Sequence, residues 1–293
     1  TLTNERTFQF AVLAKSAEVY LAGSSEEAEL LNALSSSFSA IVHDILNIRT
    51  LLRRMETLCS LPDLEQNELW RFLAADVDQF FGYVQSMFDY LAEGISLCFP
   101  APKNKLLNFG LLMKWYQSPR KEISKSEDLA FQSTLLEGTW IKELRDIRNA
   151  LVHNGAESLA ILDNDKILFH IQHSEPLKLT AKTLNPRLIS ARIPTYVDFR
   201  LYAGVVLIRL CAYLNNITES IQQELARRDI AKARVYPVEV HLPNMSLVKE
   251  WMELGARTLC EEEETGPVYE ALSISSPNSS LGLVNFIEQE LAY

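Results

Sequence analysis

The sequence predicts a mainly all-α protein: a helical bundle with one inserted β-hairpin and a small mixed extension at its C-terminal end. Three observations lead to this prediction. Apolar residues recur at three- and four-residue spacing over most of the first 230 residues. The spacing changes to alternation in SLAILDNDKILFHIQH, and four prolines interrupt the chain beyond Arg234. The expected domains are therefore a helical bundle over residues 1–230, with the hairpin at about 158–173, and an acidic C-terminal extension over 231–293.

Four helices are expected before residue 120, each ending at a residue that disfavours helix. The first ends at Gly23, the second before Pro62 and the third before Pro100. Their expected ranges are Thr7–Ala22, Glu26–Cys59, Glu68–Phe99 and Lys105–Tyr116.

The second half of the chain combines helices with the predicted hairpin. A helix is expected from about Phe131 to His153, and the hairpin turns at Asp163-Asn164-Asp165. A long, apolar helix follows from about Thr195 to Arg228. Beyond it, two short helical segments near 248–259 and 283–291 have a periodicity too weak to predict a core element.

Composition favours a soluble, cytoplasmic protein. The four cysteines show no CxxC spacing, and three have apolar neighbours, so we expect reduced, buried thiols. No signal-peptide pattern is present. The most apolar run, LYAGVVLIRLCAYL, is too short for the lipid core and contains Arg209. We therefore expect a buried helix and no membrane partner.

The net charge of −10 is concentrated at the C-terminal end. Nine glutamates and one arginine follow from Glu250 onward, a net of −8 that leaves −2 for the preceding residues. Because binding depends on the local patch, this balance argues only weakly against RNA as a partner. The glutamates from Glu261 to Glu264 are expected to lie outside any catalytic unit, where they could cover a basic surface.

The common enzyme motifs are absent, including GxGxxG, GxxxxGK[ST], HExxH and GxSxG. His170 and His173 should lie on opposite faces of a strand, so no metal site and no cofactor are predicted. His43 is expected to be a satisfied or exposed helix residue. The arginines at 49, 53 and 54 are expected to form a solvated face, although they could instead extend a basic track.

The segment RDIRNALVHNG, residues 145–155, places several polar side chains at a helix end. The preceding stretch predicts an apolar stripe of Leu136, Trp140, Leu144, Ile147 and Leu151. Opposite it, Arg145, Asn149 and His153 follow at i, i+4 and i+8, while Lys142, Arg145 and Arg148 form an i, i+3, i+6 row. Arginine forks and a histidine suit a phosphate. Alternatively, cations in a last turn complement the helix dipole.

The run Arg148-Asn149-Ala150-Leu151-Val152-His153 resembles the R-x4-6-H motif of HEPN domains, which favours a polar residue directly after the arginine. Members of that family are bundles of about four or five helices with the motif at a helix end, and some continue with Asn-Gly and a hairpin. The resemblance covers roughly residues 26–228, which implies a HEPN-like helical bundle.

The resemblance implies a metal-independent endoribonuclease that cleaves single-stranded RNA at a composite site in a homodimer. His153 would be the general acid or base, Arg148 would hold the scissile phosphate, and Asn149 would orient the pair. Lys142 and Arg145 would contact phosphate. A toxin or phage-defence role, with an antitoxin or regulatory protein as partner, is implied as well. Gly155 stands where one toxin branch carries a modified tyrosine, which puts that control in doubt. The alternative is a non-catalytic HEPN-like dimeric module that binds RNA, nucleotide or a protein.

Overall fold

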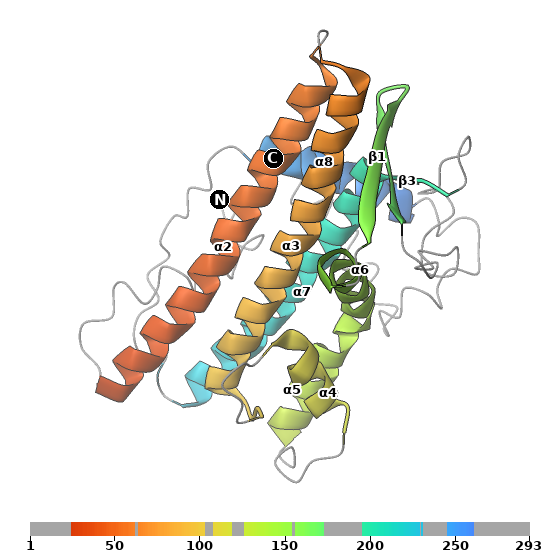
Figure 1. Ribbon diagram of the computed structural model, residues 1–293. Coiled ribbons are helices and arrows are strands. Elements are labelled where there is room, and N and C mark those ends of the chain that lie inside the picture. The colour runs from red at the N-terminus through yellow and green to blue at the C-terminus, as the bar shows by residue number, and fades with distance from the viewer. Residues whose placement is uncertain are drawn as a thin grey trace. The chain divides into compact units, whose positions relative to one another are not determined.

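A computed structural model describes residues 25–61, 64–102, 108–118, 126–153, 156–172, 195–228, 230 and 245–260 (Figure 1). Within these ranges the chain forms seven α-helices, a 3-10 helix and one three-stranded sheet, which confirms the mainly helical prediction. The helices are α2 (Ser25–Cys59), α3 (Gln66–Cys98), α4 (Phe109–Tyr116), α5 (Ser126–Leu136), α6 (Ile141–His153), α7 (Phe199–Arg227) and α8 (Ser246–Cys260). The 3-10 helix η2 is Glu137–Trp140. The helices predicted at 7–22 and 283–291 lie outside the described residues.

The chain divides into two compact units, each of which is described by itself. The first unit comprises residues 1–46, 84–142 and 211–243. The second unit comprises residues 47–83, 143–210 and 244–293. The sheet, α8 and almost all of α6 therefore belong to the second unit, whereas α4, α5 and η2 belong to the first.

Helices α2 and α3 pair antiparallel at a constant register. In the first unit, the hydroxyl of Ser37 donates to Glu93 at 3.3 Å, and the hydroxyl of Ser86 donates to Asp44. In the second unit, Arg54 donates to the carboxylate of Asp76. A contact that lies a given number of residues later in α2 lies the same number of residues earlier in α3. One stripe of side chains on each helix therefore faces the other.

The core of the first unit is aromatic. The ring of Phe88 contacts those of Phe109, Trp140 and Tyr213 at centroid distances of 5.2, 6.0 and 6.3 Å. Tyr213 is buried, and its hydroxyl donates to the carbonyl of Leu135 at 2.9 Å, as a buried phenol requires. This bond joins α7 to the end of α5.

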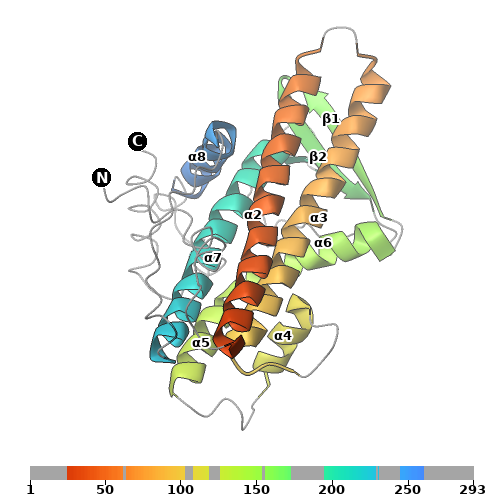
Figure 2. The ribbon, with the colours of Figure 1, turned by 90° about the vertical axis from the view of Figure 1, so that its left-hand side faces the viewer.

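The second unit contains the predicted hairpin. Strands β1 (Glu157–Asp163) and β2 (Lys166–Gln172) pair antiparallel and lie side by side in Figure 2. The turn residues Asn164 and Asp165 have φ values of 48° and 63°, which match the type I′ turn that suits a two-residue hairpin loop. The hairpin prediction is therefore confirmed.

A third strand, β3 (Val197–Asp198), pairs with β2, although helix was expected from Thr195 onward. Asp198 explains the later helix start, because its carboxylate accepts the backbone N–H groups of Arg200 and Leu201 at 3.1 and 3.4 Å. The aspartate is thus the N-cap of α7. Residues before it remain extended.

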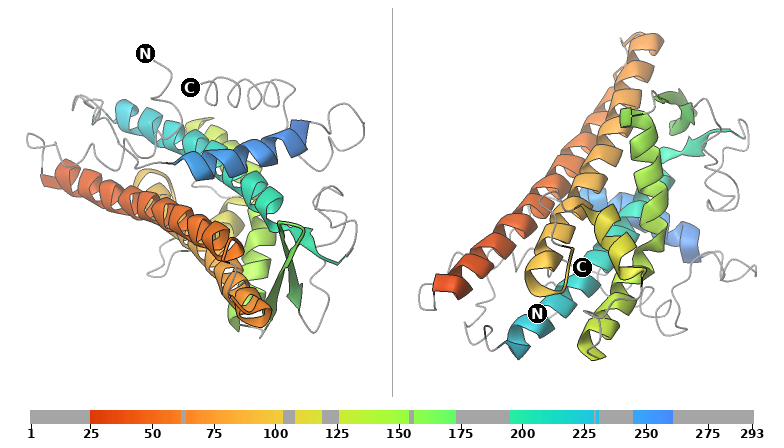
Figure 3. Two further views of the ribbon diagram at one scale, coloured as in Figure 1. Left: turned by 90° about the horizontal axis from the view of Figure 1, so that it is seen from above. Right: turned by 60° about the horizontal axis from the view of Figure 1, so that its bottom comes forward.

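Helix α8 packs closely on α7 within the second unit, where the two helices cross (Figure 3). A Cβ atom on Gly255 would lie 2.5 Å from the Val205 nitrogen, and one on Gly204 would overlap the Trp251 carbonyl. Trp251 is 1% exposed and contacts the ring of Phe199. The expectation that no core element lies beyond residue 231 is therefore wrong for α8. Glu261 to Glu264 lie outside the described residues.

Helix α7 is long and apolar enough to span a membrane by those two criteria, and 72% of its most apolar window is buried in the protein. Among the helices that the structure describes, no other meets the criteria. Burial of this degree is typical of a core helix and is consistent with a soluble protein.

Candidate functional site

The candidate site is the polar side of α6, which follows directly on η2. The helix forms because its apolar residues fall on one side and bury Ile141, Leu144, Ile147 and Ala150, each 1–4% exposed. Leu144 and Ile147 confirm the predicted stripe. The other predicted members, Leu136, Trp140 and Leu151, are only half-buried. The apolar side fixes the rotation of the helix and so determines which residues face outward.

The cationic residues of α6 are partly accessible. The Arg145 side chain is 27% exposed, and its Nε lies 4.0 Å from a carboxylate oxygen of Asp146. Lys142, one turn earlier, is exposed. Asp146 moderates the positive charge that the row of basic residues suggested, because its side chain lies on the same accessible side and is 47% exposed.

Arg148 and Asn149 are brought together by a hydrogen bond. The Nη1–H of Arg148 donates to Oδ1 of Asn149 at 3.4 Å, and both residues are half-buried. The two residues are neighbours in the sequence, and the structure places one guanidinium N–H against the amide oxygen.

Helix α6 ends where the motif ends. His153 is its last residue, and the N–H of Ala156 donates to the carbonyl of Ala150 at 3.1 Å, which closes the last turn. Strand β1 begins at Glu157, immediately after this bond. The side chain of His153 and both residues of Asn154-Gly155 lie outside what the structure describes.

Val152 is an apolar residue that the sequence interpretation overlooked. It is 57% exposed in the last turn of α6, directly before the last residue of the motif. Its neighbours at i−3 and i−4 are Asn149 and Arg148. The only available signal was its place outside the apolar stripe, which predicted exposure but no role.

Two other histidines lie within the described residues, His43 and His170. His43 is exposed on α2, as expected. The Nδ1 atom of His170 lies 3.0 Å from the carbonyl oxygen of Thr195, and His173 lies outside the described residues. Within the described ranges, no group of three histidine, cysteine or acidic residues could hold a metal ion.

The cysteines of the described ranges are poor nucleophiles. Cys59, Cys98 and Cys211 are free thiols. Burial raises the pKa of the Cys98 thiol to about 11 and that of Cys211 to about 12. Burial also raises the pKa of Cys59, which nearby Arg200 only partly offsets. Thiolates are therefore scarce near neutral pH.

Two arginines of α2 lie on an exposed face, as expected: Arg53 is exposed, and the side chain of Arg54 is 52% exposed. Arg54 nevertheless donates to Asp76, whose side chain is 2% exposed. Burial raises the pKa of Asp76, and the bond from Arg54 and its charge act against that rise. Arg54 is thus committed to structure, which removes it from the basic track that the sequence left open.

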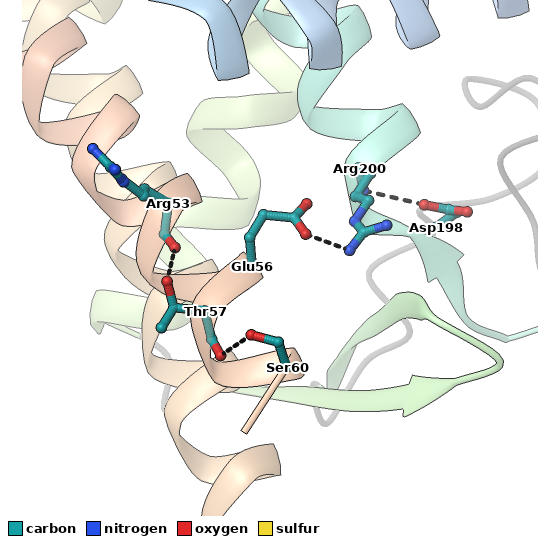
Figure 4. A network of polar contacts seen from close by, with 6 residues as sticks. All are labelled: Arg53, Glu56, Thr57, Ser60, Asp198 and Arg200. Atoms are coloured by element: carbon teal, nitrogen blue, oxygen red, sulfur yellow. Dashed lines mark hydrogen bonds and ion pairs between the residues drawn. The ribbon is translucent and has the colours of Figure 1, made fainter. Parts of the chain in front are cut away.

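A second polar network in the second unit joins the end of α2 to the start of α7 (Figure 4). The guanidinium of Arg200 donates to Glu56 at 2.7 Å, and Asp198, which caps α7, lies 3.8 Å from the Lys166 ammonium. At the end of α2, the hydroxyl of Thr57 donates to the carbonyl of Arg53 at 2.9 Å. The hydroxyl of Ser60 donates to the carbonyl of Thr57 at 2.8 Å.

The two acids of that network each face a base, Glu56 beside Arg200 and Asp198 beside Lys166. These contacts hold the helix ends together. This network could not be predicted from the sequence, because Glu56 and Arg200 are far apart along the chain.

The geometry therefore leaves the end of α6 as the site with accessible cations, a fixed arginine–asparagine pair and a chain reversal. These groups can hold an oxyanion, and a histidine such as His153 can transfer a proton near neutral pH. Comparison of the chain with protein-family models, curated proteins and solved structures finds no match in any of the three.

Proposed function

We propose that this protein is a HEPN-type endoribonuclease that cleaves single-stranded RNA without a metal ion. The observation that carries the proposal is the hydrogen-bonded pair of Arg148 and Asn149 in the last turns of α6, a helix that ends at His153. The immediate change to the β1–β2 hairpin matches the order of elements that the resemblance implies.

The reaction needs an acid, a base and a group that offsets negative charge. The ribose 2′-oxygen attacks the adjacent phosphorus as its proton passes to an imidazole, and the bond from phosphorus to the 5′-oxygen breaks. A second histidine, in its protonated imidazolium form, gives its proton to that 5′-oxygen, which leaves a 2′,3′-cyclic phosphate. In a homodimer, the two copies of His153 supply both groups. Arg148 offsets the charge on the phosphorane, and Asn149 keeps the guanidinium in place.

The accessible side of α6 suits a nucleic-acid strand. Arg145 and Lys142 are accessible cations for flanking phosphates, and Val152 offers an apolar surface to a sugar or base. Asp146 lowers the net charge of this surface, so affinity should be modest and strongly dependent on salt.

The decisive experiment compares His153→Ala with His43→Ala, a matched change at an exposed histidine on α2. In a nuclease, His153→Ala lowers the cleavage rate by roughly a hundredfold or more, because a general acid or base is lost. RNA affinity changes little, and His43→Ala cleaves like the wild type. Arg148→Ala lowers both rate and affinity. Cleavage should persist at about the same rate when millimolar EDTA is present, and the products should carry a cyclic phosphate.

Two outcomes would remove the proposed reaction. One is cleavage that disappears with EDTA and returns with magnesium. The other is a wild-type protein that binds RNA, as a dimer, and leaves it intact under all conditions tested. The second outcome would favour the non-catalytic HEPN-like module, in which His153→Ala changes affinity alone. A strict monomer by light scattering, with RNA present, would contradict the composite site.

A further inference from the structure

A cavity of about 500 Å³ opens in the first unit between α5, η2 and the second half of α7. This volume lies within the roughly 300–1,000 Å³ that is typical of small-molecule sites. Helix α7 contributes polar residues at three- and four-residue spacing: Asn216, Glu219, Ser220, Gln223, Glu224 and Arg227. At about 1.5 Å per residue, this side of the cavity extends about 16 Å along the helix.

The two ends of the cavity can be identified from contacts within the first unit. Tyr213 donates to the carbonyl of Leu135, so the end of α5 and the following Glu137 lie near the Asn216 end. At the other end, the guanidinium of Arg228 donates to the carbonyl of Cys98, next to Phe99. The cavity therefore has one end near Glu137 and one near Phe99.

The Phe99 end is apolar. The rings of Phe99 and Phe131 stack at a centroid distance of 3.7 Å and an interplanar angle of 5°, and the residues are 7% and 3% exposed. Tyr116 supports Phe131 from the side with an edge contact at 5.6 Å. The accessible edge of this stacked pair gives the cavity a small, rigid apolar wall at this end.

The charges at the two ends differ. Near Phe99, Glu224 is paired with Arg227 and accepts a hydrogen bond from Arg228 at 2.7 Å, so its charge is compensated. Near Asn216, Glu219 accepts a weak bond from the Gln223 amide at 3.4 Å. Glu137 and Glu219 are both exposed, and among the described residues no ion pair involves either of them. Partial desolvation raises the pKa of the Glu137 carboxyl.

We propose that this cavity binds a small organic amine, with the ammonium group at Glu137 and Glu219 and the hydrocarbon body on the stacked rings of Phe99 and Phe131. An ammonium group compensates the charge of the two acids. An anion would be repelled by them, and the nearby Arg227 is already paired with Glu224. A bare metal ion is disfavoured by the donor set, because the described residues offer no group of three ligands. The elongated shape favours a linear molecule.

The test uses the full chain and three six-carbon probes in titration calorimetry: hexylamine, hexanol and hexanoate. Hexylamine should bind saturably at about millimolar concentration, as expected of a ligand with seven heavy atoms. Hexanol, which lacks the charge, should bind at least about fivefold more weakly, and hexanoate should not bind.

Substitutions in the cavity test whether hexylamine binds there. Glu137→Gln and Glu219→Gln should each weaken hexylamine about fivefold, while Glu29→Gln, the same change at an exposed residue of α2 in the same unit, should have no effect. Ala130→Trp fills the cavity from an exposed position and should abolish binding. Equal affinity for hexylamine and hexanol, or binding that survives both Glu137→Gln and Ala130→Trp, would overturn the proposal. Absence of hexylamine binding to the wild type would overturn it as well. No RNA is needed, so the result is independent of the proposed nuclease.

Discussion

Helices α6 and α8 are both short and amphipathic, and both belong mostly or wholly to the second unit, but they differ in what their sequences disclose. In α6 the apolar side is buried, the polar side carries the Arg148–Asn149 pair, and the helix ends at the motif residue His153. In α8 the important position is a glycine, Gly255, which lets the helix approach α7 to backbone contact. The first helix has a recognisable motif, and the second has none.

This difference separates features that depend on residues close together in the sequence from features that depend on distant residues. A motif at a helix end is set by spacing within one turn, so the sequence displays it directly. A close helix crossing depends on two glycines that lie far apart in the chain and that look like weak helix positions when read singly. Changes in α8 should therefore affect stability, and changes at the polar end of α6 should affect activity. The following predictions test this division, from the largest effect to the smallest.

A chain that ends at residue 244 should not fold cooperatively. It lacks α8 and the residue before it, and with them the buried side chains of Met245, Val248, Trp251 and Met252, which are 1–7% exposed. Each buried side chain contributes about 1.5–3 kcal/mol, and their sum is comparable with the roughly 5–15 kcal/mol of a typical domain. Thermal unfolding followed by circular dichroism measures this. A chain that ends at residue 260 retains α8 and serves as the control. A sharp, wild-type transition in the shorter chain would show that α8 contributes little.

Gly255→Val should lower the free energy of unfolding by about 3 kcal/mol or more, because its side chain meets the backbone of α7 and the helices must separate. Gly82→Ala, in α3 of the same unit, is the matched control. Its new Cβ meets no atom within 4 Å, so it should stabilise by up to about 1 kcal/mol. Urea denaturation of both variants measures the difference. Similar values for the two would contradict the close crossing.

His153→Ala and Arg148→Ala should each change the free energy of unfolding by about 1 kcal/mol or less. Arg148 is only half-buried on the polar side of α6, where substitutions usually change stability little. Differential scanning calorimetry would reveal a larger loss. A sharp fall in the melting temperature of His153→Ala, without any cleavage to lose, would identify the histidine as a helix cap, and the nuclease proposal would have to be abandoned.

Asp198→Asn should show the smallest effect, visible only in its dependence on pH. Burial raises the pKa of the Asp198 carboxyl above its ordinary 3.8, despite opposing bonds from Leu201 and Arg200 and the nearby charges of Lys166 and Arg200. Stability from the protonated group is fully present below that ordinary value and is lost as pH rises through the folded-state pKa. Asparagine retains the cap without titrating. The free energy of unfolding of the wild type, relative to the variant, should therefore fall as the pH rises above the ordinary value of 3.8. A relative rise would contradict the burial effect.

Much of the fold could be predicted from the sequence because its helices are long and their periodicity is regular. The predicted range of α2 agrees with the structure to one residue, and Asp163-Asn164-Asp165 correctly located the hairpin turn. The segment from Phe131 to His153 was predicted as one helix. The structure divides it into α5, η2 and α6, since the chain tightens to 3-10 geometry over Glu137–Trp140.

The two candidate sites, the end of α6 and the cavity of the first unit, also differ in how far the sequence predicted them. Spacing alone predicted that Arg148 and Asn149 are neighbours, because adjacent helix residues need no tertiary information. The cavity of the first unit was not predicted, since Glu137 and Phe131 come from one part of the chain and Glu219 from another. Its one local signal was the polar stripe of α7 from Asn216 to Arg227, which the preceding apolar run obscured. Asp76 and Arg54 were missed for the same reason, because their pairing requires the α2–α3 register.

That constant register also limits how the length of α2 and α3 can change in evolution. One residue inserted between Asp44 and Arg54 would rotate the following part of α2 by about 100°, which would turn Arg54 away from Asp76. A deletion would do the same in the opposite direction. Related chains should therefore differ in the length of this helix pair by matched changes in both helices, or by changes at the connection near residues 60–65. Insertions at that connection leave both stripes in contact, so it is the natural place for new sequence to enter the protein.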